Sequence, residues 1–137
     1  MAHWLMKSEP SVWSWTQQVE AGAKGTFWNG VRNHQAKQCL MAMKKGETAF
    51  FYHSNEERAV VGIVEIIKTF YPDPTDESGK FGMVDVRAKK AFRTPVPLTA
   101  IKAETNLAKM VLVNNSRLSV QPVSDEEWAV VCAMGGL

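Results

Sequence analysis

The sequence predicts an α+β fold in which short helices flank a mixed or curved β-sheet. Segments rich in Val, Ile and aromatic residues are interleaved with short stretches of helical periodicity. Several of these strand candidates follow one another through non-helical loops, and the regular alternation of an α/β protein is absent. The 137 residues suit one core. No repeat, low-complexity tract or linker divides them, so we expect a single domain over residues 1–137.

The chain begins with a strand and a short helix. Residues 4–8 form the predicted strand, which Pro10 closes because proline disfavours continuation and restricts the residue before it. Ser14 and Gln17 have the spacing of a capping box, in which each side chain bonds the backbone N–H of the other residue. They therefore predict a helix over residues 15–21.

A tight turn and a second helix come next. Asn29-Gly30 predicts the turn, because glycine adopts conformations that residues with a Cβ resist. Apolar residues then recur at helical spacing, and a basic pair with a glycine marks the end of that helix. These residues are Ala36, Cys39, Leu40, Met43 and Lys44-Lys45-Gly46. We expect Trp28, Arg32 and Asn33 to lie on the loop entering this helix, where backbone donors are free and side chains converge.

The middle of the chain predicts three strands. Residues 48–52 are rich in aromatic side chains, and residues 59–71 are rich in Val and Ile. Residues 84–89 alternate apolar and charged side chains, which is typical of a half-buried strand. We expect this third strand to reach Arg93 at most, because Pro95 breaks it.

The last part of the chain predicts a helical segment, a strand and a final helix. The helical segment covers residues 103–110, and the alternating strand begins at residue 118 and ends at Pro122. Ser124 and Glu127 form a second capping box, which starts the final helix.

Composition narrows the class of protein. Hydrophobic residues make up 45% of the chain, too many for a disordered protein. The net charge of +2 and the pI of about 8.6 neither require nor exclude a polyanionic partner. Cys39 and Cys132 lie on the apolar sides of predicted helices, which favours reduced core cysteines over a disulfide.

The sequence shows no targeting or membrane segment. The N-terminus lacks a signal-peptide pattern, and the apolar run over residues 59–67 is interrupted by Glu65 and is too short to span a membrane. We therefore expect a cytoplasmic protein with no membrane partner.

Catalytic chemistry is poorly represented. The histidines are His3, His34 and His53, and no nucleophile elbow, Cys-x-x-Cys pair, His-Glu-x-x-His motif or glycine-rich phosphate loop accompanies them. Ser54 follows His53, but adjacent residues of an extended chain point to opposite sides. A zinc site built from His34, His53 and Cys39 would lack any recognised spacing. The sequence therefore carries no recognisable catalytic motif, and we expect no metal and no cofactor.

Binding chemistry is better represented. Polar and aromatic side chains gather at the ends of predicted elements, in Lys7-Ser8-Glu9, Trp28, Arg32-Asn33, Tyr52-His53-Ser54-Asn55 and Arg117-Leu118-Ser119. An aromatic face beside amides and hydroxyls holds a flat heterocycle by stacking and by recognition of its edge. The structural alternative is that Arg32 and Arg117 bond loop carbonyls, Glu9 pairs with one of them, and Trp28 packs in the core.

Motifs in one order along the whole chain resemble signatures of the EVE-domain family. They are Lys7-Ser8-Glu9-Pro10, Trp28-Asn29-Gly30-Val31-Arg32-Asn33, Gln35-Ala36, Tyr52-His53-Ser54-Asn55, Gly62-Ile63, Pro72-Asp73-Pro74-Thr75 and Arg117-Leu118-Ser119-Val120-Gln121-Pro122. The resemblance implies a PUA-like fold, with a curved, barrel-like β-sheet flanked by helices and a relationship to the YTH readers of methylated adenine. It also implies binding of a modified nucleobase, chiefly modified cytosine in DNA, which is flipped into a pocket.

The resemblance also assigns roles to side chains. Trp28 would form the stacking wall, Arg32 and Asn33 would line the entrance or the base edge, and other polar residues would complete the pocket. The candidate nucleobase-binding residues are Lys7, Ser8, Glu9, Trp28, Arg32, Asn33, Tyr52, His53, Ser54, Asn55, Arg117 and Ser119. Two positions depart from the family pattern, because Asn29 stands where Asp is usual and His34 where Tyr is common. Both departures bear on which base is preferred.

With this resemblance, we expect a nucleic-acid-binding module, for DNA or RNA, that recognises a modified, cytosine-type nucleobase in an aromatic pocket. The alternative is a small enzyme or sensor that acts on a free nucleotide or related metabolite, with His53 as its base. The two differ in whether basic residues form a track that leads to the pocket. Those residues are Lys44, Lys45, Arg87, Lys89, Lys90 and Arg93.

Overall fold

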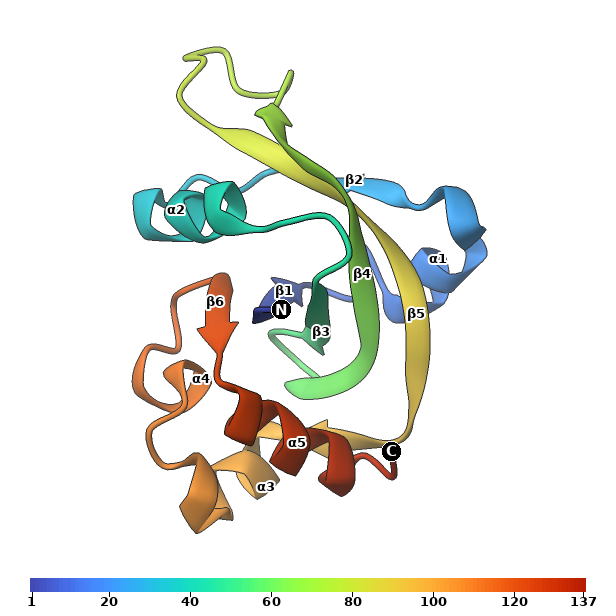
Figure 1. The fold of residues 1–137 in the computed structure, drawn as a ribbon, viewed down its shortest axis with the longest axis vertical. Coiled ribbons are helices and arrows are strands. Elements are labelled where there is room, and N and C mark those ends of the chain that lie inside the picture. The colour runs from blue at the N-terminus through green and yellow to red at the C-terminus, as the bar shows by residue number, and fades with distance from the viewer.

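The computed structural model describes residues 1–137 and contains one curved, open, six-stranded sheet (Figure 1). The strands are β1 (His3–Ser8), β2 (Thr26–Trp28), β3 (Thr48–His53), β4 (Ala59–Pro72), β5 (Gly82–Pro97) and β6 (Val120–Val123). They follow the order β2-β5-β4-β3-β1-β6. β1 and β3 are parallel and the other neighbouring pairs are antiparallel, so the predicted α+β class with a curved mixed sheet is confirmed.

Five α-helices flank the sheet. They are α1 (Trp15–Glu20), α2 (His34–Ala42), α3 (Leu98–Ala103), α4 (Val111–Asn114) and α5 (Asp125–Met134). Figure 1 shows α2 near one end of the long strands and α3, α4 and α5 grouped near the other, while the β4–β5 hairpin projects beyond α2. None of these helices combines the length and the apolar character needed to cross a membrane.

The sheet carries a hydrophobic core on each face, because successive side chains of a strand point to opposite sides. On β3, Phe51 belongs to the core that also contains Leu40 of α2. Its neighbour Phe50 belongs to the core that also contains Val131 of α5. Residues at the ends of β1 and β3 can therefore contribute to two different surfaces.

Both predicted capping boxes are present. Ser14 Oγ accepts a hydrogen bond from the Gln17 N–H at 3.2 Å, and Gln17 Oε1 accepts one from the Ser14 N–H at 2.9 Å. Ser124 and Glu127 make the same reciprocal pair at the start of α5. These bonds satisfy amides that a helix start leaves without intrahelical partners, which is why the two helix starts were predictable.

Four segments differ from the sequence prediction. Residues 26–28 form the short strand β2, so Trp28 lies on a strand and not on a loop. β5 continues through Pro95 and β6 through Pro122. Both prolines lie where one side of the strand has no neighbouring strand, because β2 pairs only with residues 84–86 of β5 and β6 is outermost in the sheet. Such a position tolerates a residue without an N–H.

The fourth difference is the helical region before β6. The sequence predicted one helical segment over residues 103–110, but only a 3₁₀ turn at Thr105–Leu107 lies inside it, because α3 ends at Ala103 and α4 begins at Val111. The side chains that anchor this region, Ile101, Leu107 and Leu112, are buried in the core beneath α5. Tertiary packing therefore sets these boundaries more than local periodicity does.

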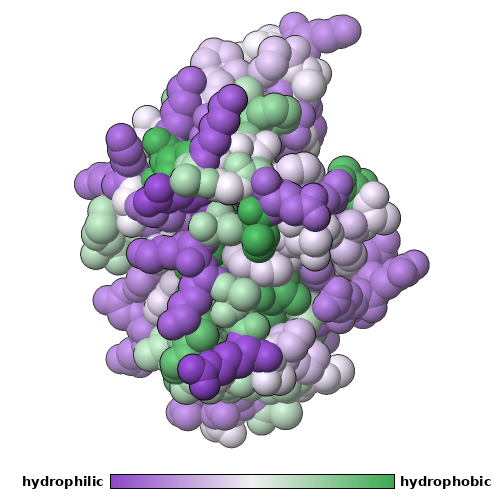
Figure 2. Space-filling model, turned by 90° about the vertical axis from the view of Figure 1, so that its right-hand side faces the viewer, coloured by the Kyte–Doolittle hydropathy of each residue, from purple (hydrophilic) through white to green (hydrophobic).

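The remaining surface and the cysteines are ordinary for a folded domain. Cys39 and Cys132 are free, half-buried thiols, as predicted, and burial raises the pKa of each. Figure 2 shows the face that carries α1, β2 and β5, where hydrophilic side chains surround small, separate apolar patches. Scattered exposed apolar groups of this kind are common on protein surfaces.

Candidate functional site

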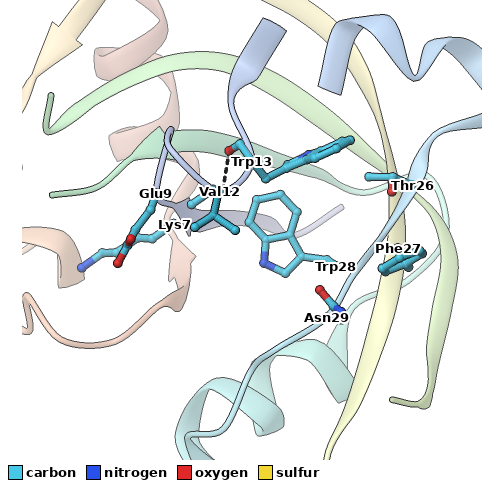
Figure 3. Close-up of a pocket in the computed structure, with 9 residues that line it drawn as sticks. Lys7, Glu9, Val12, Trp13, Thr26, Phe27, Trp28 and Asn29 are labelled. Carbon is cyan, nitrogen blue, oxygen red and sulfur yellow. Dashed lines mark hydrogen bonds between the residues drawn. The ribbon is translucent and has the colours of Figure 1, made fainter. Parts of the chain in front are cut away.

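A cavity of about 500 Å³, which we call the first pocket, opens between the end of β1 and the edge strand β2 (Figure 3). Its lining comes from the end of β1, the β1–α1 loop, β2 and the residue after β2. The lining residues are Lys7, Ser8, Glu9, Val12, Trp13, Thr26, Phe27, Trp28 and Asn29. The structure thus brings together Lys7, Ser8, Glu9 and Trp28 of the predicted set.

Trp28 forms one wall of the first pocket. Alternation along β2 turns Trp28 inward and Phe27 outward, and their exposed fractions are 7% and 54%. The Trp28 ring packs edge-on against Phe51, with the ring centres 5.5 Å apart. Its indole N–H makes no hydrogen bond within the protein, yet the only fully buried unpaired side-chain atom is Oε1 of Gln121. The Trp28 N–H is therefore accessible and free to donate to a ligand.

Trp13 forms a neighbouring wall, and its position is fixed at both ends. Its indole N–H donates to Gln18 Oε1 at 2.9 Å, and the fully buried Gln18 donates in turn to the carbonyl of Val86 at 3.3 Å. Its carbonyl accepts a 2.6 Å hydrogen bond from Ser8 Oγ (Figure 3). The two indoles come from separate elements and line one cavity, which suits a flat ligand.

Lys7 and Glu9 are the two charged residues that line the first pocket. Lys7 is half-buried and forms no ion pair, and burial lowers its pKa. The Lys7 ammonium donates to the carbonyl of Ser116 at 2.5 Å and lies 5.8 Å from the centre of the Tyr52 ring. The Glu9 side chain is exposed. The Lys7 side chain therefore extends from the first pocket toward Tyr52 on the other face of the sheet.

Arg32 holds the loop that follows β2. Its guanidinium donates to Asp73 Oδ2 at 3.0 Å and to Thr75 Oγ1 at 2.9 Å, and the Gly30 N–H donates to the same Asp73 oxygen at 2.9 Å. Gly30 adopts a φ of +81°, which lets the loop turn back toward Asp73. Burial would raise the pKa of Asp73, but the hydrogen bonds from Thr75, Gly30 and Arg32 hold it well below its usual range. Arg32 does not line the first pocket.

Asn33 is the N-cap of α2. Its Oδ1 accepts a hydrogen bond from the Ala36 N–H at 2.9 Å, the interaction by which an N-cap stabilises the first turn of a helix. Asn33 also lies outside the lining of the first pocket. Arg32 and Asn33 thus fix the backbone next to Trp28 and Asn29.

His53 has both ring nitrogens engaged. Nε2 accepts a hydrogen bond from the Trp15 N–H at 3.0 Å, and Nδ1 lies 2.7 Å from Oε2 of Glu57. A nitrogen that accepts an N–H carries no proton, so Nδ1 is the protonated atom and donates to Glu57. With 8% of its surface exposed, His53 anchors the start of α1 and offers no free lone pair to a substrate.

The other predicted residues at the end of β3 and just after it line a separate cavity of about 380 Å³, which we call the second pocket. Its lining residues are Lys7, Tyr52, Ser54, Asn55, Arg58, Leu98, Lys102, Leu112 and Ser116. Tyr52 and Leu112 belong to the core beneath α5, whereas Trp28 belongs to the core beneath α2. The two pockets therefore lie on opposite faces of the sheet and share Lys7.

Arg117 and Ser119 line neither pocket. Arg117 is exposed and forms no ion pair. The carbonyl of Ser119 accepts a hydrogen bond from the Lys7 N–H at 2.9 Å. This bond fixes the backbone of β1 at the point where Lys7 enters both cavities.

Sequence reasoning missed Val12, Trp13, Thr26 and Phe27, and it named Asn29 only as a departure from the family pattern. Trp13 carried a usable signal, because a tryptophan just before the N-cap Ser14 belongs to no predicted strand or helix that would bury it. The other three lie in positions set by the β1–α1 loop and by the pairing of β2 with β5. That pairing had no local sequence signal.

The basic residues considered as a track do not line the first pocket. Arg87 pairs with Glu65 at 2.8 Å, and Lys89 and Lys90 line two other cavities. Lys7 is the one basic residue in the lining of the first pocket. No group of three or more His, Cys, Asp or Glu side chains is arranged to hold a metal ion.

Comparison with known sequences points to one family. The family model described as the EVE domain matches residues 2–134. Thymocyte nuclear protein 1 of Homo sapiens is 36% identical to this chain, and the match covers 97% of this chain and 73% of that protein.

Solved structures share the fold. A protein of Rhodopseudomonas palustris, solved by NMR, is 62% identical with a TM-score of 0.94 and covers 99% of this chain and 94% of its own. The human THYN1 protein in complex with DNA containing 5-methylcytosine is 36% identical with a TM-score of 0.91, and covers 100% and 99%. A YTH domain of Zygosaccharomyces rouxii is 17% identical with a TM-score of 0.59, over 98% and 86%. The expected likeness to the YTH fold is confirmed.

Proposed function

We propose, since this chain belongs to the EVE domain family, that its first pocket binds a modified nucleobase of a nucleic-acid strand. The observation that carries the proposal is the pair of indole walls, Trp13 and Trp28, on one cavity of about 500 Å³. Aromatic walls stack on the face of any base, and polar groups beside them read the base edge. The free Trp28 N–H and the amide of Asn29 supply such polar groups.

A base must leave its stack before it can enter the first pocket. Unstacking and unpairing cost a few kcal/mol, and stacking on an aromatic side chain contributes roughly 1–3 kcal/mol per base. Stacking on two indoles therefore offsets the free-energy cost of flipping, and hydrogen bonds to the base edge contribute the further binding free energy that favours the bound state. The base is accordingly flipped out of its strand in the proposed complex.

The proposed preference is for a cytosine with a substituent at carbon 5. The relative solved with DNA containing 5-methylcytosine, human THYN1, motivates that choice. In this chain Val12 lines the first pocket and offers an apolar surface to a methyl group. Burial of one methyl group contributes about 0.8 kcal/mol, so discrimination against plain cytosine is on the order of fourfold and grows to about tenfold with a second favourable contact.

The side chain of Asn29 bears on the edge of the base. An amide both donates and accepts hydrogen bonds, whereas the Asp usual in the family pattern only accepts them when ionised. Asn29 lines the first pocket at the end of β2. It therefore makes the pocket tolerant of more than one arrangement of donors and acceptors on the base.

A competition titration tests the proposal. Otherwise identical oligonucleotides carry plain cytosine, 5-methylcytosine, 5-hydroxymethylcytosine or N6-methyladenine at one position, and each is measured at two salt concentrations. We expect one modified cytosine to bind several-fold more tightly than the others, with a gentle loss of affinity as salt rises, because a chain with a net charge of +2 makes few phosphate contacts. Equal affinity for all four, with a steep dependence on salt, would identify a nonspecific backbone binder and reject the proposal.

A further inference from the structure

The second pocket is lined by hydrogen-bond donors that the protein itself does not use. The hydroxyls of Tyr52 and Ser54 and the side-chain amide of Asn55 line it, and none of these groups has a side-chain hydrogen bond within the protein. Arg58 donates from Nε to the carbonyl of Asn55 at 2.9 Å, which leaves its two terminal nitrogens free. A pocket of unused donors suits a ligand with several acceptor atoms.

The second pocket also carries positive charge without a compensating carboxylate. Lys7, Arg58 and Lys102 line it, and its lining contains no Asp or Glu. The ion pairs of the molecule join other residues, so none of these three cations is neutralised by a partner. Three cations around a concave surface favour an anion.

The backbone at the rim of the second pocket is unusual. Asn55 has a φ of +74° and Arg58 a φ of +46°, and they are the only residues other than glycine with a positive φ. The left-handed region costs free energy in a residue with a Cβ, more so for a long side chain such as arginine. This conformation places the Asn55 carbonyl where it orients the Arg58 guanidinium.

We propose that the second pocket binds a phosphate group. Four chemical types of donor converge there, namely guanidinium, ammonium, hydroxyl and amide, and a phosphate offers acceptor oxygens for all of them. Lys7 lines both cavities, so the phosphate belongs to the same strand or nucleotide as the base in the first pocket. This second clause rests on the proposed function, whereas the phosphate site itself does not.

The test uses two charge-removing variants and a matched control. Lys102→Gln and Arg58→Gln each remove one cation from the second pocket, and both side chains belong to exposed residues, so we expect the variants to fold. Lys45→Gln removes a cation that is also exposed but lines neither pocket. The probes are a 5-methylcytosine oligonucleotide with hydroxyl ends, its unmethylated twin, the free methylated nucleoside and the 5′-monophosphate of that nucleoside.

We expect Lys102→Gln and Arg58→Gln each to weaken the binding of both oligonucleotides by about threefold to tenfold relative to Lys45→Gln. The slope of log affinity against log salt should fall by about 0.7–0.9 for each variant, as expected for one lost phosphate contact. The affinity for the nucleoside and the ratio between the methylated and plain oligonucleotides should not change. Weaker binding of the hydroxyl-ended oligonucleotides identifies an internal phosphodiester as the bound group. Weaker binding of the monophosphate alone identifies a terminal phosphate.

The two proposals fail separately in this experiment. If both variants match Lys45→Gln with every probe, the phosphate site is rejected, even where the wild-type protein prefers the methylated strand. If the wild-type protein shows no preference for the methylated strand, the base proposal is rejected. The phosphate site still stands in that case, provided that the variants weaken the phosphate-containing probes.

Discussion

Trp28 serves the hydrophobic core and the first pocket at once. Its ring meets Phe51 edge-on and only 7% of its surface is exposed, while its indole N–H remains free. The structural alternative raised from the sequence, that Trp28 packs in the core, therefore holds beside the proposed binding role. A substitution has to separate the two contributions.

Replacement of Trp28 by Phe and by Ala separates them. Trp28→Ala should lower the free energy of unfolding by about 3–5 kcal/mol, because it leaves a cavity beside Phe51. Trp28→Phe keeps most of the packing but removes the N–H and part of the stacking surface, so it should lose less stability and several-fold of the affinity for a methylated oligonucleotide. Thermal melting and titration of both variants measure these effects. Unchanged binding by Trp28→Phe would leave Trp28 with a packing role alone.

His53 is expected to stabilise the fold and not to catalyse a reaction. His53→Ala removes the acceptor of the Trp15 N–H and should cost about 1–3 kcal/mol of unfolding free energy. The exposed His34 provides the control, since His34→Ala removes an imidazole without a buried hydrogen bond. Mass spectrometry of modified nucleosides, nucleotides and oligonucleotides after incubation with the wild-type protein should show them unchanged. A product that disappears in His53→Ala would restore the enzyme alternative.

The loop between β2 and α2 is tied to the β4–β5 hairpin through Asp73. Gly30 and Arg32 both donate to this buried carboxylate, and the ring centre of Phe81, the last residue of the β4–β5 loop, lies 5.8 Å from the Arg32 guanidinium. Asn29 and Trp28 precede the tied residues directly. The hairpin that projects beyond α2 in Figure 1 therefore helps to hold one wall of the first pocket.

The tie should show itself in the dependence of stability on pH. Asp73 has a lowered pKa in the folded protein. Its stabilising contribution is therefore fully present above about pH 4, the ordinary pKa of an aspartate in the unfolded chain, and is lost as the pH falls further. Asp73→Asn should cost about 1–3 kcal/mol at pH 7, and the gap to the wild type should shrink below about pH 4. Urea unfolding across that range measures the gap, with the exposed Glu77→Gln as control. A gap that stays constant with pH would show that the ionised carboxylate is not the stabilising species.

Elements with local signals were predictable, and elements set by partners were not. The capping boxes at Ser14 and Ser124 place the starts of α1 and α5, because each box depends on residues three apart in the sequence. β2 depends on the register with which residues 26–28 meet β5, which no local pattern encodes. Pro95 and Pro122 were expected to end their strands, but each lies where the strand lacks one neighbour.

At the scale of the whole molecule, two cavities open on opposite faces of one sheet and meet at Lys7. The sequence grouped Tyr52-His53-Ser54-Asn55 with Trp28 as one site, because all of them end predicted elements. Alternation along β3 sends Tyr52 and Phe51 to different cores, and the first pocket forms on the Phe51 side. The types of residue were predictable from the sequence, whereas their division between two pockets depends on the register of the sheet.

The structure of the protein bound to an oligonucleotide with a single 5-methylcytosine tests the central claim most directly. We predict that the methylated base lies outside its stack, in the first pocket, with its face against the indoles of Trp13 and Trp28 and its edge within hydrogen-bond distance of the Trp28 N–H or the Asn29 side chain. A complex in which the base stays stacked in its strand, or lies against another cavity while the first pocket holds only solvent, would contradict the account.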